Sequence, residues 1–252
     1  MDFVKTINEA GLGKTHIFSM GQAGFIIKST SGQLLGIDLY LSDCVQRVEP
    51  DHVGYKRLLP KILNPKDIEL DVIVCTHFHR DHFDIDSVPE LMNNDKTQLF
   101  CPRDCEEDTN GLKRVNFVKP GDTCRAGDFL LRFINCDHGT GAPLAVGVVV
   151  EVDGKRIIEV GDTCLRADRK EEYLKFGEID VLIAPINGMY GNLDSKDCAQ
   201  LTDLLQPKLV IPCHYGMFAA HHGDVGLFHE IMDKDYANRK YLIMSQGEKY
   251  TF

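Results

Sequence analysis

The sequence predicts an α/β protein of four layers, an αββα sandwich in which two β-sheets pack face to face and helices cover both outer surfaces. Two stretches of consecutive strand-like segments joined by tight turns each precede short apolar runs that alternate with helical patterns. The chain of 252 residues is 43% hydrophobic and 26% charged, which suits one globular core, and no linker-like segment interrupts it. We therefore expect a single domain over residues 1–252.

The first half begins with segments typical of an antiparallel meander. Strands are expected over 15–20, 24–30 and 33–40, and a Ser-Gly turn joins the last two. The runs that follow are rich in Val, Ile and Leu between turn-forming residues, as expected for strands covered on both faces. They are DVIVCTH (71–77), QLFCP (98–102) and RVNFV (114–118), with a helical pattern in SVPELMNN (87–94).

The second half repeats this order. FLLRFINC (129–136) and the segments on either side of Asp153-Gly154 predict another meander, because Asp-Gly favours a two-residue hairpin turn. Buried strands are then expected at DVLIAPI (180–186) and KLVIPCH (208–214). Helical patterns flank these strands at 166–176, 195–206 and 224–232. The repeat predicts two similar halves that pack sheet on sheet.

Charge and composition narrow the class of partner. Lys and Arg total 28 against 38 Asp and Glu, a net charge of -10, so the protein lacks the attraction that nucleic acids and anionic membranes require. We expect a small-molecule substrate, no nucleic acid and no membrane, and leave a homo-oligomer open. The chain has no apolar run of signal-peptide or membrane-spanning length, and its nine cysteines are scattered, which favours a reducing, cytoplasmic location.

One short segment concentrates residues that bind metals. His77, His79, Asp81 and His82 directly follow the predicted strand DVIVC. Alternation at the strand end directs His77 and His79 to one side, and the following turn lets Asp81 and His82 approach from another. Neutral imidazole and carboxylate are the ligands that divalent cations such as zinc and manganese accept. This loop therefore predicts a site for two neighbouring cations.

Three further candidates lie at the ends of other predicted strands. His138 follows FLLRFINCD, Asp162 ends KRIIEVGD and His214 ends KLVIPCH. Loops gather at strand ends to form sites, so these positions favour a shared centre with the histidine-rich loop. With that loop they supply seven candidate ligands, enough for two cations and a bridging carboxylate.

These motifs, in this order, resemble the metallo-β-lactamase superfamily over almost the whole chain. The resemblance implies the αββα fold, a first cation held by His77, His79 and His138, a second held by Asp81, His82 and His214, and Asp162 as the bridge. Other stretches are similar to the branch that contains L-ascorbate-6-phosphate lactonase. They are GQAGFIIKS, GIDLYLSD, VKPGD, IDVLIAPING and LVIPCHY.

The expected activity is metal-dependent hydrolysis by a metal-bridging hydroxide. Two divalent cations lower the pKa of a shared water and polarise the substrate oxygen. The expected substrate is a small ester or lactone, with a sugar-phosphate lactone such as L-ascorbate 6-phosphate as the candidate that the resemblance implies. Asp81 and Asp162 are the candidate catalytic proton acceptors, ranked below the bridging hydroxide acting alone because metal ligation already uses their basicity. The lactonase resemblance favours manganese, zinc suits the histidines, and iron is a further candidate.

Residues around the ligands have predicted supporting roles. Asp38 is an acid within an apolar run, and we expect it to orient a metal ligand from behind. Side chains one loop away from the ligands are candidates for substrate binding. They are Asn187, Tyr190, Asn192, His221 and His222.

Three alternatives remain at this stage. A phosphodiesterase or nuclease of the same fold would need a basic surface, which the net charge disfavours. A non-catalytic metal-binding protein would not need all seven ligand types in order. A thioester hydrolase like those acting on hydroxyacylglutathione usually adds a C-terminal helical domain, and only about 38 residues follow His214.

Overall fold

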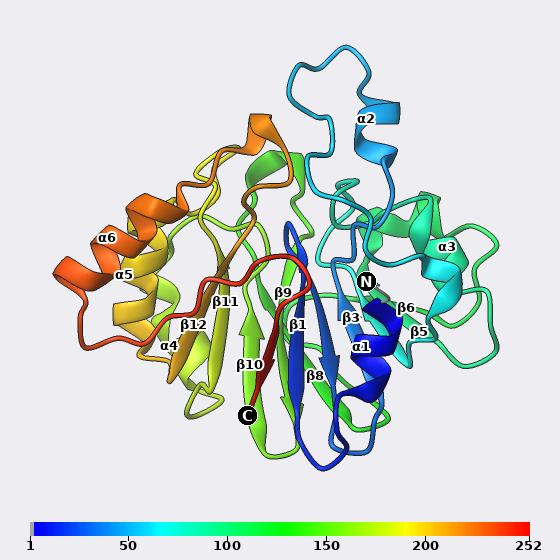
Figure 1. Ribbon diagram of the computed structural model, residues 1–252, viewed down its shortest axis with the longest axis horizontal. Helices are drawn as coiled ribbons and strands as arrows, with labels where there is room; N and C mark the ends of the chain where they lie inside the picture. The colour runs from blue at the N-terminus through cyan, green and yellow to red at the C-terminus, as the bar shows by residue number, and fades with distance from the viewer. Residues whose placement is uncertain (1–2) are drawn as a thin grey trace.

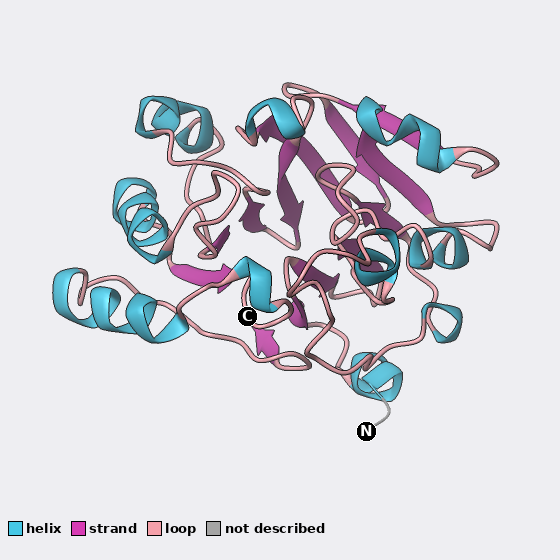
Figure 2. Cartoon of the chain, turned by 90° about the horizontal axis from the view of Figure 1, so that it is seen from above, coloured by secondary structure: helices cyan, strands magenta, loops and turns pink. Residues whose placement is uncertain are grey.

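The computed structural model describes residues 3–252 and consists of two β-sheets packed face to face between helical layers (Figure 1). Helices α1 (Phe3–Glu9) and α3 (Ser87–Leu91) cover one outer face. Helices α4 (Lys170–Leu174), α5 (Ser195–Leu205) and α6 (Val225–Asp235) cover the other. Figure 2 shows the same layers from above. The predicted four-layer α/β sandwich is confirmed.

The first sheet has seven strands within the described residues, in the order β13-β1-β2-β3-β4-β5-β6. Strands β13, β1, β2 and β3 are antiparallel neighbours, and β3 to β6 are parallel. The bounds are β1 His16–Gly21, β2 Gly24–Lys28, β3 Leu34–Ile37, β4 Val72–Val74, β5 Gln98–Pro102, β6 Val115–Val118 and β13 Lys249–Thr251. The last strand thus returns to the beginning of the domain.

The second sheet, counted over the same residues, has six strands in the order β12-β11-β10-β9-β8-β7. Strands β7 to β10 are antiparallel, and β10 to β12 are parallel, so the predicted repeat of meander and parallel strands is confirmed. Asp153 and Gly154, with φ of 52° and 72°, form the predicted hairpin turn. The bounds are β7 Thr123–Ala126, β8 Phe129–Asn135, β9 Val146–Val152, β10 Lys155–Glu159, β11 Val181–Pro185 and β12 Leu209–Cys213.

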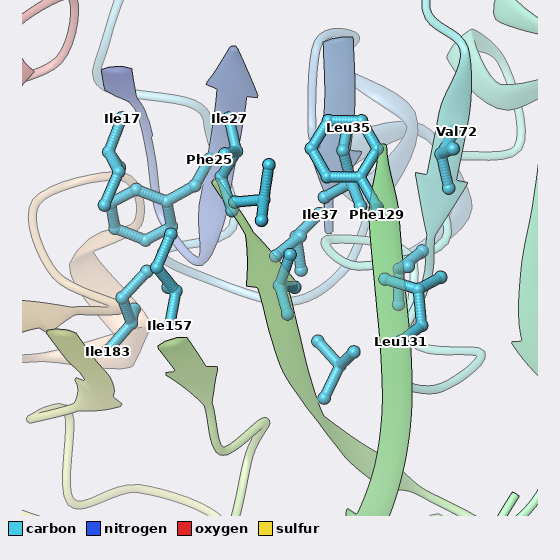
Figure 3. Packing of buried hydrophobic residues seen from close by; sticks show 14 of the residues in the cluster. Ile17, Phe25, Ile27, Leu35, Ile37, Val72, Phe129, Leu131, Ile157 and Ile183 are labelled. Atoms are coloured by element: carbon cyan, nitrogen blue, oxygen red, sulfur yellow. The ribbon is translucent and has the colours of Figure 1, made fainter. Parts of the chain in front are cut away.

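Alternation along each strand divides the core into layers. Ile17 points into the space between the sheets, whereas its neighbour Phe18 packs on the outer side with α1. The inner layer brings Phe25 of the first sheet and Phe129 of the second into one cluster (Figure 3). Each fully buried side chain of this size contributes about 1.5–3 kcal/mol, so the layer between the sheets contributes substantially to stability.

The structure departs from the predicted elements at a few points. Strand β3 ends at Ile37, short of the expected 33–40, because Asp38 turns the chain with a φ of 45°. The helix expected over 166–176 divides into a short 3-10 turn, Ala167–Arg169, and α4. Helices α1 and α2 (Cys44–Val48) were not predicted, since they are too short for a clear helical period.

The same end of the sandwich carries every element that leads to the candidate ligands. His77 follows β4, His138 follows β8, and His214 follows β12. Helix α2 and its loop project above this end (Figure 1). Within residues 3–252 every helix is too short or too polar to cross a membrane. The nine cysteines, all between residues 44 and 213, are free thiols.

Candidate metal centre

The loop after β4 is a tight turn that directs several side chains to one point. Backbone amides of His82 and Phe83 donate to the carbonyl of His79, at 2.9 and 2.7 Å. At the start of the loop the amide of Thr76 donates to Asp38 Oδ1 at 2.7 Å. These bonds leave little freedom to the backbone between them.

Three imidazoles form the first group. His79 Nδ1 lies 3.0 Å from His77 Nε2 and 3.2 Å from His138 Nε2. Burial lowers the pKa of each ring, that of His79 to about 4. All three are therefore neutral at pH 7 and present lone pairs, as a divalent cation requires.

Asp38 fixes the orientation of His82. Its Oδ2 lies 2.7 Å from His82 Nδ1 and accepts the Thr76 hydroxyl at 2.6 Å, and all three side chains are fully buried. Within residues 3–252, His82 Nε2 has no hydrogen-bond partner. A buried imidazole that is held through Nδ1 and leaves Nε2 free is typical of a metal ligand, so this residue fits a cation.

Asp162 lies between the groups. Its Oδ2 is 3.2 Å from His214 Nε2, 3.4 Å from His82 Nε2 and 3.9 Å from His138 Nε2. Burial alone would raise the pKa of Asp162, but His214 and His82 hold it well below its usual range. The Nδ2 amide of Asn192 donates to the same oxygen at 2.8 Å, which fixes the carboxylate from behind.

A second group is formed by Asp81, His214 and His221, whose ligand atoms lie within 4.8 Å of one another. The rings of His214 and His221 stack at 5.0 Å between centroids. Gln22 Nε2 donates to Asp81 Oδ2 at 2.8 Å and lies 2.8 Å from His221 Nδ1. Burial opposes protonation of His214, but Asp162 and Asp81 raise its pKa to about 9.

All seven residues predicted as ligands lie close together at this centre, and Asp38 Oδ2 lies 2.7 Å from His82 Nδ1. The five residues predicted to contact substrate lie in three different places. Tyr190 and His221 line a cavity above the centre, whereas Asn187 and Asn192 are buried together behind Asp162. His222 is exposed and lies outside the lining of that cavity within the described residues.

Sequence reasoning missed the grouping of His221 with Asp81 and the contacts of Gln22. No ligand spacing points to either residue, because His221 follows His214 by seven residues through an irregular loop. The only signals in the sequence are the residue types themselves, a glutamine in GQAGF and a histidine pair in FAAHHGD.

The cavity has a volume of about 830 Å³ and opens directly onto the candidate ligands. This is within the range of small-molecule sites. Its other walls come from α2 and the loop after it, the metal-binding loop, the segment 139–141 and Tyr190. A small substrate therefore has direct access to the metal centre.

Comparison with known proteins identifies the class. Residues 16–214 match the model of the Beta-lactamase superfamily domain, which covers most of the chain. The chain belongs to the metallo-β-lactamase superfamily. A relative from Anaeromyxobacter dehalogenans, named "UPF0173 metal-dependent hydrolase", is 29% identical over 233 residues, covering 85% of this chain and 80% of the relative. The prediction of a metal-dependent hydrolase is confirmed at the level of class.

Solved structures agree on the fold. Igni18, a metallo hydrolase from Ignicoccus hospitalis, superposes with a TM-score of 0.74 at 23% identity over 95% of this chain and 98% of that one. The metallo-beta-lactamase fold protein YhfI from Bacillus subtilis gives a TM-score of 0.70 at 15% identity, over 95% and 99% of the two chains. These likenesses support the sandwich and its connectivity.

Proposed function

We propose that this protein hydrolyses a small-molecule ester or lactone with two divalent cations, manganese or zinc, with iron as a further candidate. One observation carries the proposal: Asp162 Oδ2 lies within 3.9 Å of imidazole nitrogens on both sides of the centre, at the floor of an open cavity. A carboxylate in this position suits a bridge between two cations.

Each cation has a proposed set of ligands. His77, His79 and His138 hold the first, and Asp81, His82 and His214 hold the second, with Asp162 shared. His221 adds a further donor on the second side, because its Nδ1 lies 3.7 Å from Asp81 Oδ2. The all-nitrogen first group favours zinc, whereas the carboxylates of the second also suit manganese or iron(II).

When bound, the cations would lower the pKa of water and polarise the substrate carbonyl. The protein's own groups prepare for this. Asp38 fixes His82, Asn192 fixes Asp162, and Gln22 fixes Asp81, each through a hydrogen bond of 2.7 to 2.8 Å. Asp81 and Asp162 are ionised at pH 7, so either is a candidate proton acceptor if metal ligation leaves an oxygen free.

The competing functions have less support. A phosphodiesterase acting on nucleic acid would need cationic surface near the cavity, and the net charge is -10. A non-catalytic metal-binding protein would have no need of an 830 Å³ cavity open to the ligands. Sequence resemblance alone implies L-ascorbate 6-phosphate as a substrate, and the assay panel includes it beside uncharged lactones. A cytoplasmic location is proposed on the free thiols of cysteines 44 to 213.

The test uses chelator-treated protein reloaded separately with Mn²⁺, Zn²⁺ or Fe²⁺. Each form is assayed with a panel of lactones, aryl esters, phosphodiesters and thioesters. We expect hydrolysis of an ester or lactone to depend on the added cation and to exceed that of phosphodiesters by at least about 100-fold in kcat/KM. Faster cleavage of phosphodiesters, or no dependence on cation, would reject the proposal.

A further inference from the structure

One wall of the cavity is apolar and is formed by a segment above the metal centre. Val45 and Val48 come from α2, and Tyr55 comes from the loop that follows it. Phe78 and Tyr190 complete the wall. Val48 and Tyr190 are 37% and 54% exposed, which leaves apolar surface beside the ligands uncovered.

The charged side chains of the cavity are already engaged. Apart from the candidate ligands, Arg80 and Glu49 are the only charged residues of its lining within the described chain. Arg80 Nη1 donates to Asp108 Oδ2 at 2.5 Å, and Glu49 Oε2 lies 2.7 Å from His52 Nδ1. The one cationic side chain of this lining, among the described residues, is thus already paired with a carboxylate, which weakens its attraction for a phosphate on the far end of a substrate.

The apolar wall is anchored at its base. Asp84 is fully buried and accepts the backbone amides of Leu41 and Ser42 at 2.9 and 2.8 Å, just before α2. Arg57 donates to the carbonyls of Tyr40 and Ser42 at 3.0 and 3.1 Å, which closes the segment into a loop. At its rim the hydroxyls of Tyr55 and Tyr190 lie 2.9 Å apart. The wall is therefore formed before substrate arrives, which reduces the entropy lost on binding.

From this apolar wall and the pairing of Arg80 with Asp108, we propose that the substrate is an uncharged ester or lactone with an aliphatic or aromatic arm. The inference rests on the proposed hydrolase function. The reactive carbonyl lies at the metal centre, and the arm packs on Val45, Val48 and the two tyrosines. Burial of a methylene against such a wall favours binding by about two- to fourfold.

The first experiment measures kcat/KM of the cation-loaded enzyme on γ-lactones whose side chain grows from methyl to hexyl. We expect an increase of about two- to fourfold for each added methylene. Gluconolactone and its 6-phosphate form a second pair, and the phosphate should lower kcat/KM. A flat or falling series, or a tenfold preference for the phosphorylated lactone, would overturn the inference.

Two valines of the same segment provide a matched pair. Val48→Ser removes apolar wall, whereas Val53→Ser changes a residue that is 96% exposed and outside the lining. Val48→Ser should lower kcat/KM for the hexyl lactone by about three- to tenfold more than for the methyl lactone. Val53→Ser should change neither. Equal effects of both variants would overturn the inference.

Calorimetry with γ-lactams, which bear the same side chains and resist hydrolysis, separates this inference from the proposed function. The inference is supported if the hexyl lactam binds at least tenfold more tightly than the methyl lactam and if Val48→Ser removes this difference. This holds even if no lactone is hydrolysed, and in that case only the proposed function fails. Hydrolysis without any preference for the hexyl lactam would overturn the inference and leave the function standing. If the protein neither hydrolyses a lactone nor prefers the hexyl lactam, the proposed function and the inference both fail.

Discussion

The two sides of the metal centre differ in charge and in how the chain builds them. The first side consists of imidazoles whose pKa values are lowered by burial, so they are neutral over the physiological range. The second side combines Asp81 with His214, whose pKa the carboxylates raise to about 9. The imidazoles of the first side thus present lone pairs at pH 7, whereas a cation that binds the second side has to displace a proton from His214. This difference predicts that the two sites bind cations with unequal affinity and pH dependence.

The largest effect is expected where the two sides meet. Asp162→Ala removes the carboxylate shared by both, so the protein should lose both cations and about 10³-fold or more in kcat/KM. His79→Ala should lose the first cation and activity while retaining the second. Elemental analysis of both variants, with circular dichroism as the control for folding, makes the comparison. Full activity without metal in both variants would eliminate the mechanism.

Affinity for the second cation should depend on pH more steeply than affinity for the first. His214, with a pKa of about 9, must release its proton to bind, and so must His82, whose pKa Asp162 and Asp81 raise well above its usual value against the effect of burial. The apparent affinity should therefore rise by about tenfold or more per pH unit from 7 to 9. His79, with a pKa of about 4, imposes no such dependence over that range. Calorimetric titration in buffers of different ionisation enthalpy counts the protons released. Two sites with the same pH profile would contradict the assignment.

Asp38→Asn tests how the second side is held. The amide can still accept from the Thr76 backbone, but the group facing His82 Nδ1 can no longer act as a carboxylate. We expect affinity for the second cation to fall by about ten- to 100-fold, with little change at the first. Competition with a chelator of known affinity measures the affinity of each site for its cation. A change in melting temperature alone would assign Asp38 a purely structural role.

The smallest expected effect is a difference between substitutions at two adjacent histidines, His221 and His222. His221→Ala removes a donor beside Asp81 and should weaken the second cation by about tenfold, whereas His222→Ala changes an exposed side chain and should have no effect. Cobalt-substituted protein gives an absorption spectrum that reports the coordination of each site without any assay of activity. An unchanged spectrum in His221→Ala would return this residue to the substrate-binding role predicted from sequence.

Much of the metal-binding loop after β4 was predictable because its residues are local. His77, His79 and His82 lie within six residues after a clear apolar strand, so their spacing and the strand's alternation carry the information. The repeated order of meander and buried strands likewise predicted both sheets. The short helices α1 and α2 escaped prediction because one or two turns leave no measurable period.

The sequence by itself determined the fold class, the metal-binding loop and the position of His138, Asp162 and His214 at strand ends, since these depend on local hydrophobic period and residue type. Only the tertiary structure decided that His221 and Gln22 contact Asp81 and that Asn192 lies behind Asp162. It also decided that α2 forms an apolar wall over the centre. These contacts join residues that are distant in sequence, and Gln22 and His221, which also contact each other, are 199 positions apart. Their distances depend on how the two sheets pack rather than on any local pattern.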